Sequence, residues 1–145
     1  MDAAQGGMLE VQMGKLAQQN GQSDAVKRFG KRLEDDHAKA NDELKGVAQK
    51  AGVELPASLD KKHQAKVDRM SKVKPQDFDR RFAKEMVADH EKDVKAFRKE
   101  ANKGSNADLK QFASRTVPTL EEHLKMARDL SASHRDIGKA HKAAK

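Results

Sequence analysis

Three histidines in this sequence lie on faces of predicted helices that are otherwise apolar. His37, His90 and His123 each interrupt a stripe of Leu, Met, Val, Ala and Phe side chains that recurs every three or four residues. A buried imidazole without a partner is unfavourable, so each needs another side chain, a backbone carbonyl, water or a metal ion. Neutral imidazole nitrogen is a common ligand of transition metals. The pattern therefore predicts a metal site or a hydrogen-bonded polar cluster in the core.

Carboxylates near these histidines are candidate ligands. Glu10 lies at the edge of the apolar face of the first predicted helix, and we predict that it completes a mononuclear site with the three histidines. Three imidazoles and one carboxylate suit Zn²⁺, and they also suit iron and other transition metals. Zinc or iron is therefore the expected ion. Secondary candidates for ligands or their hydrogen-bond partners are Glu34, Asp36, Asp89 and Asp93.

The sequence departs from the pattern of a symmetric di-iron bundle. Such a site needs Glu-x-x-His on two helices, and only Glu34 with His37 fits it, because Val87 and Leu120 precede His90 and His123. Ferroxidase chemistry is accordingly not predicted. No arrangement of nucleophile and base stands out either, since the serines fit helix caps, helix surfaces and turns. The sequence thus favours a binding protein over an enzyme.

A ten-residue repeat carries two of the histidines. Residues 28–37 read RFGKRLEDDH, and residues 81–90 read RFAKEMVADH. Phe and His are rare in this chain, so their coincidence at the same spacing favours a structural repeat over chance. We expect the two segments to occupy related places in the fold.

The elements that position these residues are predicted to be helices. Four long helices are expected over about residues 3–19, 23–50, 75–103 and 107–133, with a bend at Pro118, and a short helix over about 58–72. Ser23 is a suitable N-cap, and Gly52 is typical of the position after a helix end. The expected fold is an all-α antiparallel bundle over residues 1–133, followed by a basic tail over residues 134–145.

Composition limits the partners of the protein. The 145 residues carry a net charge of +7 and have no Cys, which excludes disulfides and zinc–thiolate sites. The basic residues alternate with acidic ones and have no aromatic companions, so nucleic acid is not an expected partner, whereas another anionic partner is compatible with the basic surface. No apolar stretch approaches the roughly 20 residues that span a bilayer.

The sequence resembles the DUF4142 family of exported bacterial proteins. The resemblance rests on AAQGGMLEV at 3–11, GKLA at 14–17, VKRF at 26–29, DHAKAN at 36–41, VELP at 53–56, FD at 78–79, MVADH at 86–90 and PTLEEHL at 118–124. It implies a ferritin-like four-helix bundle, an export signal that Met1 replaces, and a periplasmic or secreted location. Glu10 and the three histidines match the polar core positions of the family.

Two functions follow from these features. The first is an exported metal-binding bundle that stores or senses a transition metal or takes part in oxidant-related chemistry. The alternative is a structural or binding module in which a metal-free cluster of His and carboxylate side chains fills the core and a basic surface meets an anionic partner.

Overall fold

The chain folds into five helices. The computed structural model describes the backbone of residues 2–143 and the side chains of residues 3–134, and this part of the chain has no β-strand. The all-α prediction is confirmed. The helices are α1 (Asp2–Asn20), α2 (Asp24–Lys50), α3 (Lys61–Ser71), α4 (Pro75–Lys103) and α5 (Ala107–Ala143).

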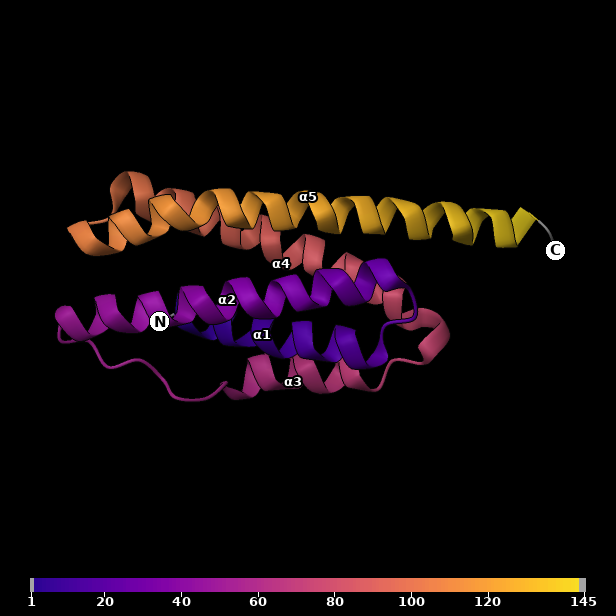
Figure 1. The fold of residues 1–145 in the computed structure, drawn as a ribbon, viewed down its shortest axis with the longest axis horizontal. Helices are drawn as coiled ribbons and strands as arrows, with labels where there is room; N and C mark the ends of the chain where they lie inside the picture. The colour runs from indigo at the N-terminus through magenta and orange to yellow at the C-terminus, as the bar shows by residue number, and fades with distance from the viewer. Residues whose placement is uncertain (1, 144–145) are drawn as a thin grey trace.

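The four long helices pair as two hairpins. α1 packs along α2 and α4 packs along α5, and in each pair the two helices run antiparallel (Figure 1). The connector after α2 returns to the other end of the molecule, so α2 and α4 run in the same direction (Figure 1). The short helix α3 lies beside α1, on the side away from α5 (Figure 1). It packs mainly against α1 and also contacts α4.

Both ends of α2 follow the predicted caps. The Ser23 hydroxyl accepts a hydrogen bond from the backbone N–H of Val26 at 3.1 Å, and Gly52 adopts the positive φ of 70° that follows α2. The prediction that the short helix begins near residue 58 is wrong, because the carboxylate of Asp60 accepts from the backbone N–H of His63 and sets the start at Lys61.

The last helix is longer than expected. α5 was predicted to end near residue 133, whereas its backbone remains helical to Ala143. Pro118 lies inside it without ending it. Of the predicted basic tail, the side chains of residues 135–145 lie outside the described part of the chain.

The two copies of the ten-residue repeat meet in the core. The rings of Phe29 and Phe82, which hold the same place in the repeat, pack edge to face with centroids 6.1 Å apart. Phe82 also stacks on Phe78 at 5.7 Å. The largest fully buried apolar side chains are Phe29, Phe78, Phe82, Met13, Leu33, Met86, Leu120 and Val26. The core therefore joins the two hairpins through α2 and α4.

Glycines bring α1 and α2 into backbone contact. A Cβ atom at Gly14 would lie 2.5 Å from the carbonyl oxygen of Gly30 and 2.9 Å from the backbone nitrogen of Glu34. A Cβ atom at Gly30 would lie 2.7 Å from the carbonyl oxygen of Gly14. Only glycine permits this approach, so the first hairpin has no side-chain layer between its helices at this level.

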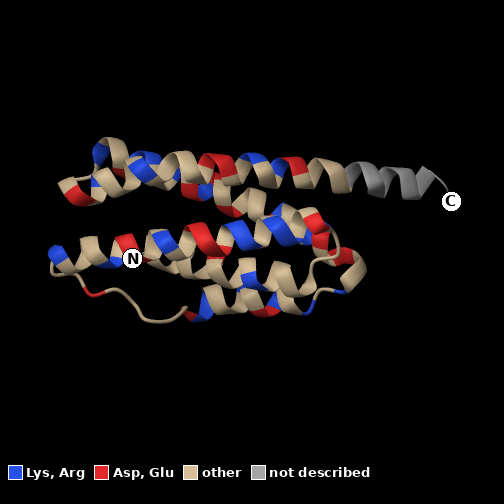
Figure 2. Cartoon of the chain, in the orientation of Figure 1, with Lys and Arg blue, Asp and Glu red and all other residues tan. Residues whose placement is uncertain are grey.

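Positive and negative side chains alternate over the described surface. Figure 2 shows Lys and Arg interleaved with Asp and Glu along the helices, in agreement with the charge pattern of the sequence. Among the described residues, no helix has the length and apolar character needed to cross a membrane.

Candidate metal centre

His37, His90 and His123 converge in the core from α2, α4 and α5. The ring centroids of His37 and His90 lie 5.8 Å apart, those of His37 and His123 lie 5.2 Å apart, and those of His90 and His123 lie 5.4 Å apart. One ring nitrogen from each histidine lies within 4.8 Å of the other two. The structure thus brings together the three histidines that the sequence singled out.

The helices fix these rings through the apolar residues around them. His37 and His90 end the two copies of the repeat, so the packing of Phe29 against Phe82 holds α2 and α4 at matching heights. His123 packs edge to face against Phe29, with centroids 6.3 Å apart. His90 and His123 are fully buried, and His37 is 6% exposed. The cluster is therefore shielded from solvent.

Two of the rings are oriented by hydrogen bonds on their outer sides. His90 Nδ1 donates to the backbone carbonyl of Met86, one turn earlier on α4, at 2.9 Å. His123 Nε2 donates to the Asp36 carboxylate, which lies on α2, at 2.7 Å. Because a carbonyl and a carboxylate only accept, these nitrogens carry the ring protons. In a neutral imidazole the opposite nitrogen then presents a lone pair.

One nitrogen on each ring faces the cluster interior, and we call these the inward nitrogens. They are His37 Nε2, His90 Nε2 and His123 Nδ1, and the structure gives none of them a hydrogen-bond partner among its described residues. Buried nitrogen atoms without a partner are unfavourable. Two of them carry lone pairs that cannot bond to one another, and a shared electron-pair acceptor such as a metal ion could bind both.

The electrostatics keep the three rings neutral near pH 7. Burial lowers the pKa of His37 well below its usual value, and the neighbouring His123 and His90 lower it further. Burial and His123 lower the pKa of His90 to about 4. Burial also lowers the pKa of His123, although its hydrogen bond to Asp36 acts in the opposite direction. Neutral imidazole is the form that binds a metal ion.

The spacing suits one ion after a small adjustment. Two nitrogens bound to the same Zn²⁺ at about 2.0–2.1 Å lie roughly 3.3 Å apart in a tetrahedral site. One nitrogen of each ring lies within 4.8 Å of the other two, so the three are close enough to share an ion with at most a small shift. Hydrogen bonds from bound imidazoles to a carbonyl or carboxylate are typical of metal sites.

The carboxylate of Asp36 belongs to a chain of charges that leads to the surface. Arg32 donates to Asp36 at 3.4 Å and pairs with Glu122 on α5 at 2.8 Å. Asp36 is therefore a hydrogen-bond partner of a candidate ligand, which is one of the two roles that the sequence left open for it. Its partner histidine, however, lies on α5 and not next to it on α2.

The other predicted carboxylates lie elsewhere. Glu34 accepts a hydrogen bond from the Gln18 amide on α1 at 2.6 Å. Glu10 is fully buried, and the charged groups that act on it are Asp89, Asp93, Glu85 and Lys66. Among the described residues, the group within ligand distance consists of the three histidines, without Glu10.

Sequence reasoning missed the part that α3 plays. Lys66 reaches α4, where its ammonium group lies 3.3 Å from Asp89 and 3.6 Å from Glu85. His63 and His134 are both half-buried: His63 pairs with Asp60 at 2.7 Å and lines a cavity, and His134 donates to a backbone carbonyl. The amphipathic pattern of α3 was the available signal that it packs on the bundle. His141 lies outside the described side chains.

Comparisons with known proteins identify the family alone. No curated protein matches the chain, and no solved structure matches it. The model of a domain of unknown function, DUF4142, matches residues 1–130. This match covers most of the chain and includes Glu10 and the three histidines. The chain therefore belongs to the DUF4142 family.

Proposed function

We propose that this protein binds one transition metal ion through His37, His90 and His123. The observation that carries the proposal is the orientation of the rings: His90 and His123 bond outward to Met86 and Asp36, and each ring keeps an inward nitrogen. The lowered pKa values support it, because the rings need not lose a proton before they bind an ion near pH 7.

The donor set favours zinc or iron. Three neutral nitrogens give one of the ligand sets found in mononuclear zinc sites, and they leave room for a fourth ligand. The sequence predicted Glu10 for that ligand, but its surroundings in the structure are Lys66 of α3 and the carboxylates of α4, so the proposed site consists of the three histidines alone. In such a site the ion would act as stored cargo, as a sensed signal or in oxidant-related chemistry.

The proposal includes the setting of the protein. We propose that the four long helices form a ferritin-like bundle and that the protein acts in the periplasm or outside the cell. The sequence resemblance supports both statements. Fractionation of cells that express the native gene, with the protein followed by antibody, tests the location: recovery from the cytoplasm alone would contradict it.

Ion binding is testable on protein purified without a histidine tag and stripped with a chelator. Titration with Zn²⁺ and Co²⁺, followed by calorimetry and by the visible absorption of Co²⁺, should show one ion per chain. The double variant His37→Gln, His90→Gln should lose the ion. His63→Gln is the matched control, because His63 pairs with Asp60 on α3 and should not contribute.

The outcomes separate the proposal from a metal-free cluster. Stoichiometric binding that only the double variant abolishes supports the metal site. A thermal unfolding midpoint that neither chelator nor added ion changes, together with no ion bound at micromolar concentration, would show that the histidines form a packed polar cluster instead. In that case, binding to an anionic polymer that weakens with salt would favour the binding-module function.

A further inference from the structure

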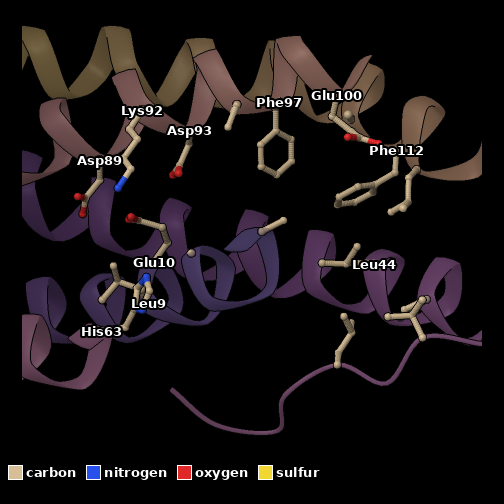
Figure 3. A pocket seen from close by; sticks show the side chains of 18 of the residues that line it. Leu9, Glu10, Leu44, His63, Asp89, Lys92, Asp93, Phe97, Glu100 and Phe112 are labelled. Atoms are coloured by element: carbon tan, nitrogen blue, oxygen red, sulfur yellow. The ribbon is translucent and has the colours of Figure 1, made fainter. Parts of the chain in front are cut away.

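A second feature of the molecule is a cavity of about 500 Å³ that is lined by residues from all five helices. Figure 3 shows that its two ends differ in character. Glu10, Asp89 and Asp93 point toward one end, and Phe97 and Phe112 lie at the other. A volume of this size is typical of sites for small organic molecules and is much larger than a bare ion requires.

The polar end contains buried acceptor atoms, which we call the cavity oxygens. They are both carboxylate oxygens of Glu10 and Oδ2 of Asp89, and within the described part of the chain none of them has a hydrogen-bond partner. Glu10 is 0% exposed and Asp89 is 8% exposed. Burial of such groups without donors is unfavourable, so a donor bound beside them would stabilise the site.

The cationic residues nearby are engaged or lie at the edge. Lys66 pairs with the other oxygen of Asp89 and with Glu85, and His63 pairs with Asp60. Lys62 and Lys92 line the cavity, but both are exposed. Within the described part of the chain, none of these cations bonds to the cavity oxygens.

The carboxylates are not arranged as ligands of a single ion. Among the described residues, the histidine cluster is the group whose ligand atoms lie close enough to share a metal ion. Glu10, Asp89 and Asp93 do not form a second group of this kind in the described part of the chain. A primary ammonium group has three N–H donors in a compact head.

The apolar end fits a hydrocarbon chain. Phe97 and Phe112 lie with centroids 6.1 Å apart, and Leu44 packs in the same cluster as Phe112. Leu109 lines this end as well. Burial of a hydrocarbon chain there removes apolar surface from water, which is favourable.

From this geometry we propose that the cavity binds a primary organic ammonium ion. The ammonium group donates to Glu10 and Asp89 beside Asp93, and the hydrocarbon part lies against Phe97 and Phe112. The proposal is independent of the metal site. It also accounts for the electrostatics of the empty cavity, where burial first, and then Asp89 and Asp93, raise the pKa of Glu10 well above its usual value. The positive charge of a bound cation would balance the negative charges of these neighbouring carboxylates.

Four probes, each with a chain of six carbon atoms, test the proposal. Calorimetry and amide chemical shifts measure their binding to the full chain. n-Hexylammonium should bind more tightly than 1-hexanol, hexanoate or hexyltrimethylammonium, which has the charge but no N–H donor. Glu10→Gln should weaken hexylammonium binding by roughly tenfold or more, because a charged hydrogen bond contributes about 1.5–3 kcal/mol. Glu34→Gln is the matched control, since Glu34 pairs with Gln18 outside the cavity.

The variants also separate this site from the metal site. Glu10→Gln should keep its metal ion, and the His37→Gln, His90→Gln double variant should keep its affinity for hexylammonium. Equal binding of all four probes would reduce the cavity to an apolar pocket, and a preference for hexanoate would assign it to anions through its lysines. Either result, or an unchanged affinity in Glu10→Gln, overturns the proposal.

Discussion

The imidazole of His123 on α5 donates to the carboxylate of Asp36 on α2 at 2.7 Å, across the interface between the two hairpins. This bond determines which nitrogen of His123 carries the proton. It also connects a fully buried ring to the Arg32 and Glu122 pair at the surface. Asp36 is thus the residue through which the histidine cluster and the exterior are linked.

We expect Asp36→Ala to weaken metal binding by about 10–100-fold, as is usual when the hydrogen-bond partner of a ligand is removed. Without Asp36, His123 can hold its proton on the inward nitrogen, which cannot then bind an ion. Competition titrations with a chromophoric chelator measure the change. Asp35→Ala is the control, because Asp35 is exposed and pairs with Lys31. Equal affinities in the two variants would contradict this role.

The metal-free protein should lose stability as the pH falls from about 6.5 to about 4. The pKa of His90 is about 4 in the folded chain and about 6.5 in an unfolded one, so the unfolded chain binds more protons in this range. The free energy of unfolding then decreases with falling pH, by about 3 kcal/mol for His90 alone. His37 and His123 act in the same direction.

Urea unfolding of chelator-treated protein at several pH values measures this decrease. In His90→Gln the slope between pH 4 and pH 6.5 should be smaller than in the unmodified protein. A slope that the substitution leaves unchanged would show that other groups cause the acid sensitivity.

Asp93 should have the opposite pH dependence. Burial and the neighbouring Asp89 raise its pKa to about 6, above its value in the unfolded chain, so its contribution to stability is lost as the pH rises through about 4 to 6. Asp93→Asn should therefore raise the free energy of unfolding at pH 7.5 by roughly 1–3 kcal/mol and should have little effect below pH 4. A loss of stability at pH 7.5 would contradict the assignment.

Gly14→Ala should destabilise the protein by about 2 kcal/mol or more, because the new Cβ would meet backbone atoms of α2 that cannot move independently. Gly46→Ala is a matched control on α2, where a Cβ meets nothing within 4 Å. That substitution should raise stability by about 0.5–1 kcal/mol, since alanine favours the helix. Unfolding in urea compares the two, and equal effects would contradict a specific contact at Gly14.

The sequence was sufficient to predict the helices and the histidine cluster, since both depend on periodic patterns. His37 and His90 end matching repeats, and a repeat that packs on itself must bring its ends together. The position of Glu10 was harder to predict, because a residue at the edge of an apolar stripe can face either of two neighbouring helices. In the structure it lies beside Asp89 and Asp93 on α4.

The amphipathic pattern of α3 indicates that it packs on the bundle, but its own residues do not show where it packs. Its pairing with the bundle depends on Lys66 and on the amide of Gln5, which bonds to the connector before α3 at Ser58 and Asp60. These contacts join residues more than 20 positions apart, and no local pattern specifies them. Lys62, His63 and Lys66 of α3 line the cavity, so its shape depends on where this helix packs.

The contact between Gly14 and Gly30 makes the first hairpin a stiff unit that carries one histidine, whereas the second hairpin carries the other two. A displacement of one hairpin against the other then changes the distance of His37 from the other two rings. An ion bound by all three rings would act as a clamp between two halves of the molecule. Binding of the ion would therefore affect the surface ion pair of Arg32 and Glu122, because that pair also joins the two hairpins.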